Sequence, residues 1–139
     1  MSYMTWDKRF SVGIQELDDQ HKRLIDLINA LHDCRVKGPG GKCVGKLLDE
    51  IAEYIKTHFS YEEALMSKVN FPGFEEHQAE HLKIIQVTAR FKRRVQSDSP
   101  PTAFELFIFL KRWLTEHILE SDKVIGKYIA NELAKQAVE

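Results

Sequence analysis

Three short breaks divide most of this chain into four apolar segments with helical spacing. Gly-Pro-Gly-Gly occupies 38–41, Asn-Phe-Pro-Gly occupies 70–73, and Ser-Asp-Ser-Pro-Pro occupies 97–101. Glycine and proline clusters of this kind end helices. Between them the apolar residues recur every three or four positions, as on one face of a helix. Four helices joined by short connections favour an all-α fold, an antiparallel up-down-up-down four-helix bundle.

The helix starts follow from the apolar spacing and from residues that cap helices. The four expected starts are Asp18 or Asp19, about Val44, about Phe74 and about Thr102. Acidic and hydroxyl side chains suit an N-cap, and Thr102 with Glu105 three residues later has the pattern of a capping box. The second helix should end at Lys68, just before its break.

The 139 residues are enough for one domain with a buried core. Within a single domain, 1–139, we expect an extended N-terminal arm over 1–18, the bundle over about 19–121, and a short C-terminal helical tail over 122–138. The net charge of −1 gives no electrostatic reason to expect nucleic acid as a partner. No apolar stretch approaches the ~20 residues that span a bilayer. The first residues lack a signal-peptide layout, so we expect a cytoplasmic protein without membrane insertion.

Two cysteines, Cys34 and Cys43, flank the first break. A hairpin of two helices could bring them close enough to form a disulfide. In a reducing cytosol, however, free thiols are favoured. The two do not form a CxxC pair, so we do not expect them to bind a metal.

Five of the six histidines and two carboxylates occupy matched positions on the four expected helices. The seven residues are His21, His58, Glu62, His77, His81, His117 and Asp122. The pair on the second helix and the pair on the third are each four residues apart, so each pair shares one helix face. His117 and Asp122 are five apart, a spacing that a regular helix does not keep on one face. We therefore expect the fourth helix to bend or end near Glu120 and Ser121.

These residues fall near the start, end, start and end of successive helices, which is one level of an up-down-up-down bundle. Imidazole and carboxylate groups are the ligands that metals such as iron take, and on apolar helix faces they are costly unless paired or metal-bound. A single histidine there is more often a packing residue, but seven at one level favour a two-metal site. His32 lies about 16 Å along the helix from His21, so we expect it to be a packing or surface residue.

Five segments resemble the motifs of the bacterial hemerythrins, and the likeness runs from about Trp6 to Tyr128 with no ligand missing. The segments are 10–14, 18–21, 58–63, 77–81 and 117–122. The resemblance implies a stand-alone, single-domain hemerythrin with two iron ions in a non-haem di-iron centre. One iron would be held by His77, His81 and His117 and the other by His21 and His58. Glu62 and Asp122 would bridge both irons, together with an oxo or hydroxo group.

Counting ligands on two six-coordinate irons leaves one position open, on the iron with two histidines. An open position distinguishes a reactive metal site from a structural one. By resemblance, the pocket over it would be lined by Leu24, Phe59, Trp113, Leu114 and Ile118. These side chains would also pack the core in any case. Once the seven ligands are assigned, we expect no other titratable side chain at that level.

The resemblance implies reversible dioxygen binding by an oxygen carrier or store, with the gas held as hydroperoxide on the five-coordinate iron. The partner would be dioxygen, with an oxygen-consuming enzyme as recipient, and we expect a monomer that is not an enzyme. Oxygen or redox sensing stays open, as does a di-iron enzyme acting on peroxide or nitric oxide. The chain lacks the Glu-x-x-His pairs of ferritin-like oxidases, and iron storage is a weaker third alternative.

Overall fold

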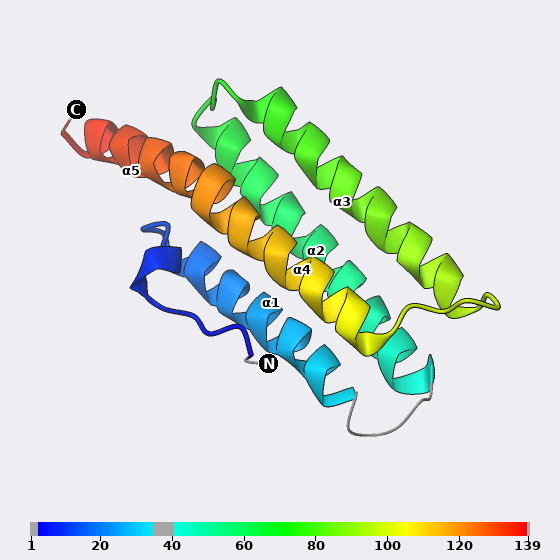
Figure 1. The fold of residues 1–139 in the computed structure, drawn as a ribbon. Helices are drawn as coiled ribbons and strands as arrows, with labels where there is room; N and C mark the ends of the chain where they lie inside the picture. The colour runs from blue at the N-terminus through cyan, green and yellow to red at the C-terminus, as the bar shows by residue number, and fades with distance from the viewer. Residues whose placement is uncertain (1–2, 35–40, 139) are drawn as a thin grey trace.

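Four long helices pack side by side and antiparallel in the computed structural model, which describes residues 3–34 and 41–138 (Figure 1). Their bounds are α1 Gln15–Cys34, α2 Gly41–Lys68, α3 Phe74–Val95 and α4 Ala103–Glu116. A fifth helix, α5, covers Lys123–Val138. The described residues contain no strand, and the prediction of an all-α up-down-up-down bundle is confirmed. None of these helices is both long and apolar enough to cross a bilayer.

The starts of α3 and α4 match the prediction. At α4 the hydroxyl of Thr102 accepts a hydrogen bond of 3.0 Å from the amide of Glu105, so Thr102 caps the helix as expected. The start of α1 was predicted wrongly. The helix begins at Gln15, and the carboxylate of Asp18 instead accepts hydrogen bonds from the Ser11 hydroxyl (2.6 Å) and the Val12 amide (2.9 Å). Asp18 therefore ties the N-terminal arm to the first turn of α1.

The arm follows the bundle closely and contains one short 3-10 turn, Lys8–Phe10. The amide side chain of Asn29 on α1 bonds both the N–H and the C=O of Met4, each at 2.8 Å. Further along, the backbone of the arm lies against α5, where a Cβ at Gly126 would fall only 2.0 Å from the carbonyl oxygen of Val12. A glycine at this position is what lets the two backbones approach.

We expected the fourth helix to bend or end near Glu120 and Ser121, but the helix continues through both residues. It widens into one π-helical turn, His117–Asp122, and continues directly into α5 (Figure 1). The amide of Lys123 bonds the carbonyl of Ile118, five residues back. Such insertions often occur at functional sites. Because a π-helical turn is wider than an α-helical one, residues five apart lie on the same face. His117 and Asp122 therefore both point inward.

The core is apolar along most of the bundle. Its largest fully buried side chains include Phe59, Phe107, Leu24, Leu31 and Leu48. A smaller apolar cluster joins the end of α2 to α5 through Met66, Val69, Ile125 and Ile129. His32 packs its ring near Phe107, with ring centres 5.5 Å apart, and takes no part in the site described below. It is a packing residue, as predicted.

Cys34 and Cys43 form a disulfide, so the prediction of free thiols was wrong. The antiparallel arrangement of α1 and α2 places their Cα atoms 5.8 Å apart, within the usual range for a disulfide. The prediction relied on the redox state of the cytosol and gave too little weight to the helix hairpin. The cytoplasmic location itself stays a prediction.

Candidate metal centre

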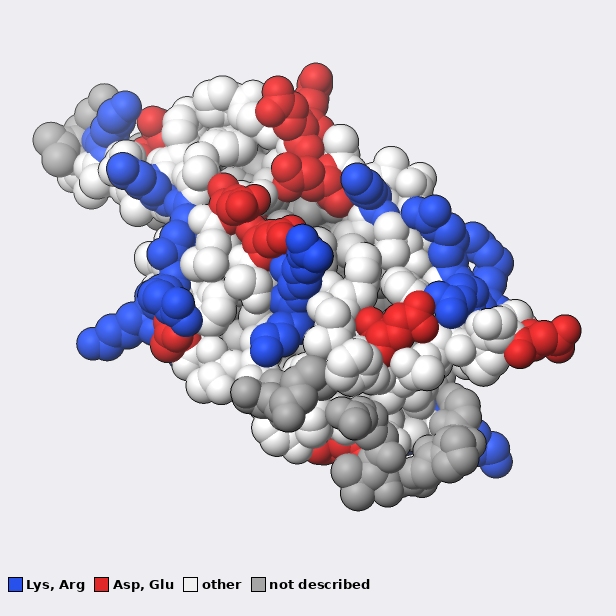
Figure 2. Space-filling view, viewed as in Figure 1, with Lys and Arg blue, Asp and Glu red and all other residues white. Residues whose placement is uncertain are grey.

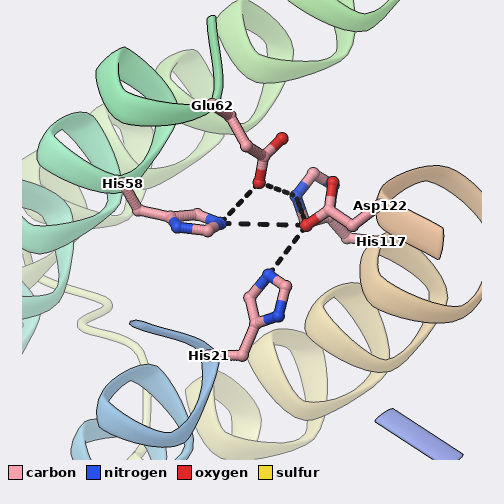
Figure 3. Close-up of side chains that lie close together, drawn as sticks. All are labelled: His21, His58, Glu62, His117 and Asp122. Carbon is pink, nitrogen blue, oxygen red and sulfur yellow. Dashed lines mark hydrogen bonds and ion pairs between the residues drawn. The ribbon is translucent and has the colours of Figure 1, made fainter. Parts of the chain in front are cut away.

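Side chains from α1, α2, α3 and the π-helical turn meet at one end of the core. Figure 3 shows five of them pointing toward one another. The structure brings together all seven residues singled out in the sequence: His21, His58, Glu62, His77, His81, His117 and Asp122. Every one is buried, and even the most accessible, His77 and His117, are only 5% exposed. The cluster is therefore almost entirely shielded from water.

Local helix geometry explains why each pair faces inward. His58 and Glu62 lie four residues apart on α2, and the same spacing places two histidines on one face of α3. His117 and Asp122 share a face only because the helix is π-helical between them. The alternating chain direction then sets all of these faces at the same level of the bundle.

Two overlapping groups of these side chains have ligand atoms that lie within 4.8 Å of one another. One group is His21, His58, Glu62, His117 and Asp122, and the other is Glu62, His77, His81 and His117. Glu62 and His117 belong to both. The cluster thus offers two adjacent positions for metal ions, and these positions have a carboxylate in common.

The two carboxylates each reach histidines on different helices. Oε2 of Glu62 lies 2.7 Å from Nε2 of His58, whereas its Oε1 lies 2.7 Å from Nε2 of His77 and 3.1 Å from Nε2 of His81. Oδ2 of Asp122 lies 2.8 Å from Nε2 of His21, and its Oδ1 lies 3.3 Å from Nε2 of His77. Both carboxylates therefore span the cluster in the way that bridging ligands require.

The histidines and carboxylates shift one another's protonation strongly. Burial alone would raise the pKa of Glu62, but the close approach of His117, His58 and other histidines holds that pKa well below its usual range. Burial disfavours the charged form of His77 and His117. Nearby Asp122 and Glu62 outweigh it, so the pKa of His77 rises to about 9 and that of His117 to about 10. Without a metal, the carboxylates are ionised and these two rings hold protons.

Several buried atoms in the cluster lack a hydrogen-bond partner although they lie close to one another. Four of them lie among the candidate ligand atoms: Nε2 of His58, Oε2 of Glu62, Nε2 of His117 and Oδ1 of Asp122; the fifth is Nδ1 of His21, on the outer side of its ring. Buried polar atoms are almost always satisfied, so an unsatisfied set of this size calls for an explanation. A metal ion among them would satisfy all four. Imidazole nitrogen with carboxylate oxygen is a donor set that suits iron, and the residues present fit a di-iron group.

Two histidines of the cluster have a hydrogen-bond acceptor behind the ring. Nδ1 of His58 donates to Oε1 of Gln20 at 2.7 Å, and Nδ1 of His81 donates to Oε2 of Glu63 at 3.0 Å. The prediction that no other titratable side chain lies at this level was therefore wrong, because Glu63 does. A ligating histidine usually has an acceptor on its outer nitrogen, although the buried Nδ1 of His21 has none here. That tendency, applied to the neighbours of the predicted ligands, could have found both residues.

Two of the five residues predicted to line a gas pocket stack on histidine rings of the cluster, and the role of the five as a pocket stays a prediction. Leu24, Phe59, Leu114 and Ile118 are fully or almost fully buried, and Trp113 is half-buried. Phe59 stacks on the ring of His81, with centres 3.7 Å apart, and Trp113 stacks on that of His117 at 5.3 Å. Aromatic rings from α2 and α4 thus cover two histidines of the cluster.

A surface groove of about 560 Å³ runs between α3 and α4 beside the cluster. Trp113 and His117 contribute to its wall, and Glu80, Glu116 and Glu120 line it as well. Figure 2 shows acidic side chains gathered over the start of α3 and the end of α4, and basic ones over the far end of α3. His117 therefore lines a groove that is also lined by the cations Lys83 and Arg112 beside its acidic residues.

Comparisons with known proteins agree with this geometry. Residues 12–129 match the family described as "Hemerythrin HHE cation binding domain". The bacteriohemerythrin of Methylococcus capsulatus is 34% identical, over 91% of this chain and 96% of the relative, and that of Stenotrophomonas maltophilia is 30% identical, over 100% and 90%. A crystal structure of a wild-type hemerythrin superposes with a TM-score of 0.85 at 32% identity, covering 92% of this chain and 98% of the other. The chain belongs to the hemerythrin family.

Proposed function

We propose that this protein binds dioxygen reversibly at a di-iron centre and serves as an oxygen carrier or store. His77, His81 and His117 would hold one iron, and His21 and His58 the other. Glu62 and Asp122 would bridge the two. Iron, when bound, supplies the reversible binding of the gas. The overlap of the two ligand groups at Glu62 supports two ions that share this carboxylate.

One observation favours a carrier over an enzyme. Outside the seven candidate ligands, only three buried residues of the described ranges are polar or charged: Asp18, Gln20 and Thr88. Asp18 holds the arm, Gln20 holds His58, and Thr88 donates to the backbone of Ile85 at 2.8 Å. Each already has a partner, so none is free to position a substrate. A catalytic pocket normally contains a few polar groups directed at its ligand.

The apolar side chains and the choice of donor groups also favour reversible binding. Leu24, Leu114 and Ile118 are completely buried, and we propose that they keep water from the cluster. Charged oxygen species leave an apolar site less readily than a wet one, because their solvation there is poor. Five neutral imidazole donors also stabilise ferrous iron better than a carboxylate-rich cage would. Both features favour return of the gas as dioxygen over loss of a reduced oxygen species that would leave ferric iron behind.

Stopped-flow mixing of the reduced, iron-loaded protein with dioxygen tests the proposal. We expect two iron ions per chain and a coloured adduct that disappears when dioxygen is removed and reforms when it is restored. Continuous consumption of a reductant would show an enzyme instead. About one iron per chain would overturn the two-ion site itself.

A further inference from the structure

The two outer hydrogen bonds of the cluster end on chemically different acceptors. Behind His81 stands the carboxylate of Glu63, whereas behind His58 stands the neutral amide of Gln20. A ligating imidazole becomes a stronger electron donor when its outer N–H bonds a carboxylate, because the negative charge draws the proton away. An amide oxygen fixes the orientation of the ring but brings no net charge. The two rings therefore differ as ligands.

Both acceptors are held in place. Gln20 is 9% exposed, and the Glu63 side chain is 24% exposed. Glu63 also accepts a hydrogen bond of 2.8 Å from the amide of Gln78, and Phe59 covers the face of the His81 ring. Because Glu63 is partly buried, water screens its charge-assisted hydrogen bond with His81 less than it would at the surface.

The difference falls across the centre. His81 belongs to one of the two ligand groups and His58 to the other. We propose that Glu63 and Gln20 are positioning residues that make the two metal positions unequal. Glu63 strengthens donation to the iron with three histidines and favours its ferric state. Gln20 leaves the iron with two histidines less electron-rich, so it stays ferrous more readily. This inference rests on the proposed di-iron function.

An exchange of the two acceptors tests the inference. Glu63→Gln keeps the size of the side chain and removes the charge, and Gln20→Glu does the reverse behind His58. We expect Glu63→Gln to raise the reduction potential of the ferric centre and to slow autoxidation several-fold. Gln20→Glu should lower the potential and speed autoxidation. Spectroelectrochemistry measures the potential, and iron-57 Mössbauer spectra of the two sites should become more alike in Glu63→Gln.

Glu80→Gln is the matched control. Oε2 of Glu80 lies 3.9 Å from Nδ1 of His77, near the cluster but beyond hydrogen-bond range, and its side chain is 57% exposed. This variant loses one nearby charge without changing any ligand's acceptor, so its potential should stay close to wild type. Equal shifts in Glu63→Gln and Glu80→Gln would overturn the proposal, because they would reflect overall charge. So would unchanged potentials in both exchange variants.

Iron content separates this inference from the proposed function. If wild type holds two irons and the exchange variants move the potential in opposite directions, the inference stands even where dioxygen binding is not reversible. If Glu63→Gln folds but no longer retains two irons, Glu63 has a structural role and the tuning role fails. If wild type itself holds fewer than two irons, the proposed function has failed.

Discussion

The two ends of this bundle are stabilised by different kinds of interaction. At one end, Leu31, Leu48 and Phe107 are completely buried, and a disulfide joins α1 to α2. At the other, seven ionisable side chains occupy the same depth of the core. Burial of apolar surface stabilises the first end directly. The second end avoids the cost of buried charge only by pairing those charges and, as proposed, by binding iron. The difference predicts that the two ends respond to different perturbations.

The largest effect is expected for Glu62→Ala. Glu62 contacts histidines from α2 and α3 and belongs to both ligand groups, so its loss removes the shared carboxylate. We expect iron to fall below two per chain. The protein should lose about 3–5 kcal/mol of stability, since breaking a buried charge network leaves its partners uncompensated. Iron analysis and thermal unfolding measure both. Retention of two irons would contradict the assignment of Glu62 as a bridge.

At the apolar end, Phe107→Ala should be nearly as destabilising without affecting iron. Phe107 is fully buried, and truncation of such a residue costs about 3–5 kcal/mol through lost burial and the cavity left behind. Chemical denaturation measures the loss. The iron content of the folded variant should match wild type. A parallel loss of iron would show that the two ends are coupled.

The sequence predicted the helices of the bundle better than it predicted the contacts at the metal-binding end. Helical spacing and the glycine- and proline-rich breaks predicted the bundle, because they are local signals. The start of α1 was missed since Asp18 bonds the arm, a contact that exists only in the folded chain. The five-residue spacing of His117 and Asp122 did signal an irregular helix, though not a continuous π-helical turn. Gln20 and Glu63 went unassigned because their partners lie on other helices.

Reduction of the Cys34–Cys43 disulfide should affect only the apolar end. The bridge closes a loop with a sequence separation of 9. Chain-entropy arguments give a loop of about ten residues roughly 2–3 kcal/mol of stabilisation. We expect the thermal midpoint of Cys34→Ser with Cys43→Ser to fall accordingly, with iron content and dioxygen binding unchanged. A shift in the optical spectrum of the iron centre on reduction would contradict this separation.

The last contrast concerns pH and the metal-free protein. The pKa values of His77 and His117 are raised to about 9 and about 10, from about 6.5 in an unfolded chain. Their protonated rings therefore stabilise the fold fully below pH 6.5, and that contribution is lost as pH rises through 9 to 10. Glu62 and Asp122, whose pKa values are lowered, stay ionised throughout this range. They add no change of their own.

Metal-free protein should accordingly lose stability steadily as the pH rises from 7 to 10. Iron-loaded protein should not lose stability by this route, because bound metal replaces the protons on the ring nitrogens. Urea unfolding of both forms across this range measures the difference, and Phe107→Ala should show the same pH dependence as wild type. Equal pH slopes with and without iron would mean that the histidine protons and the metal do not occupy the same nitrogens.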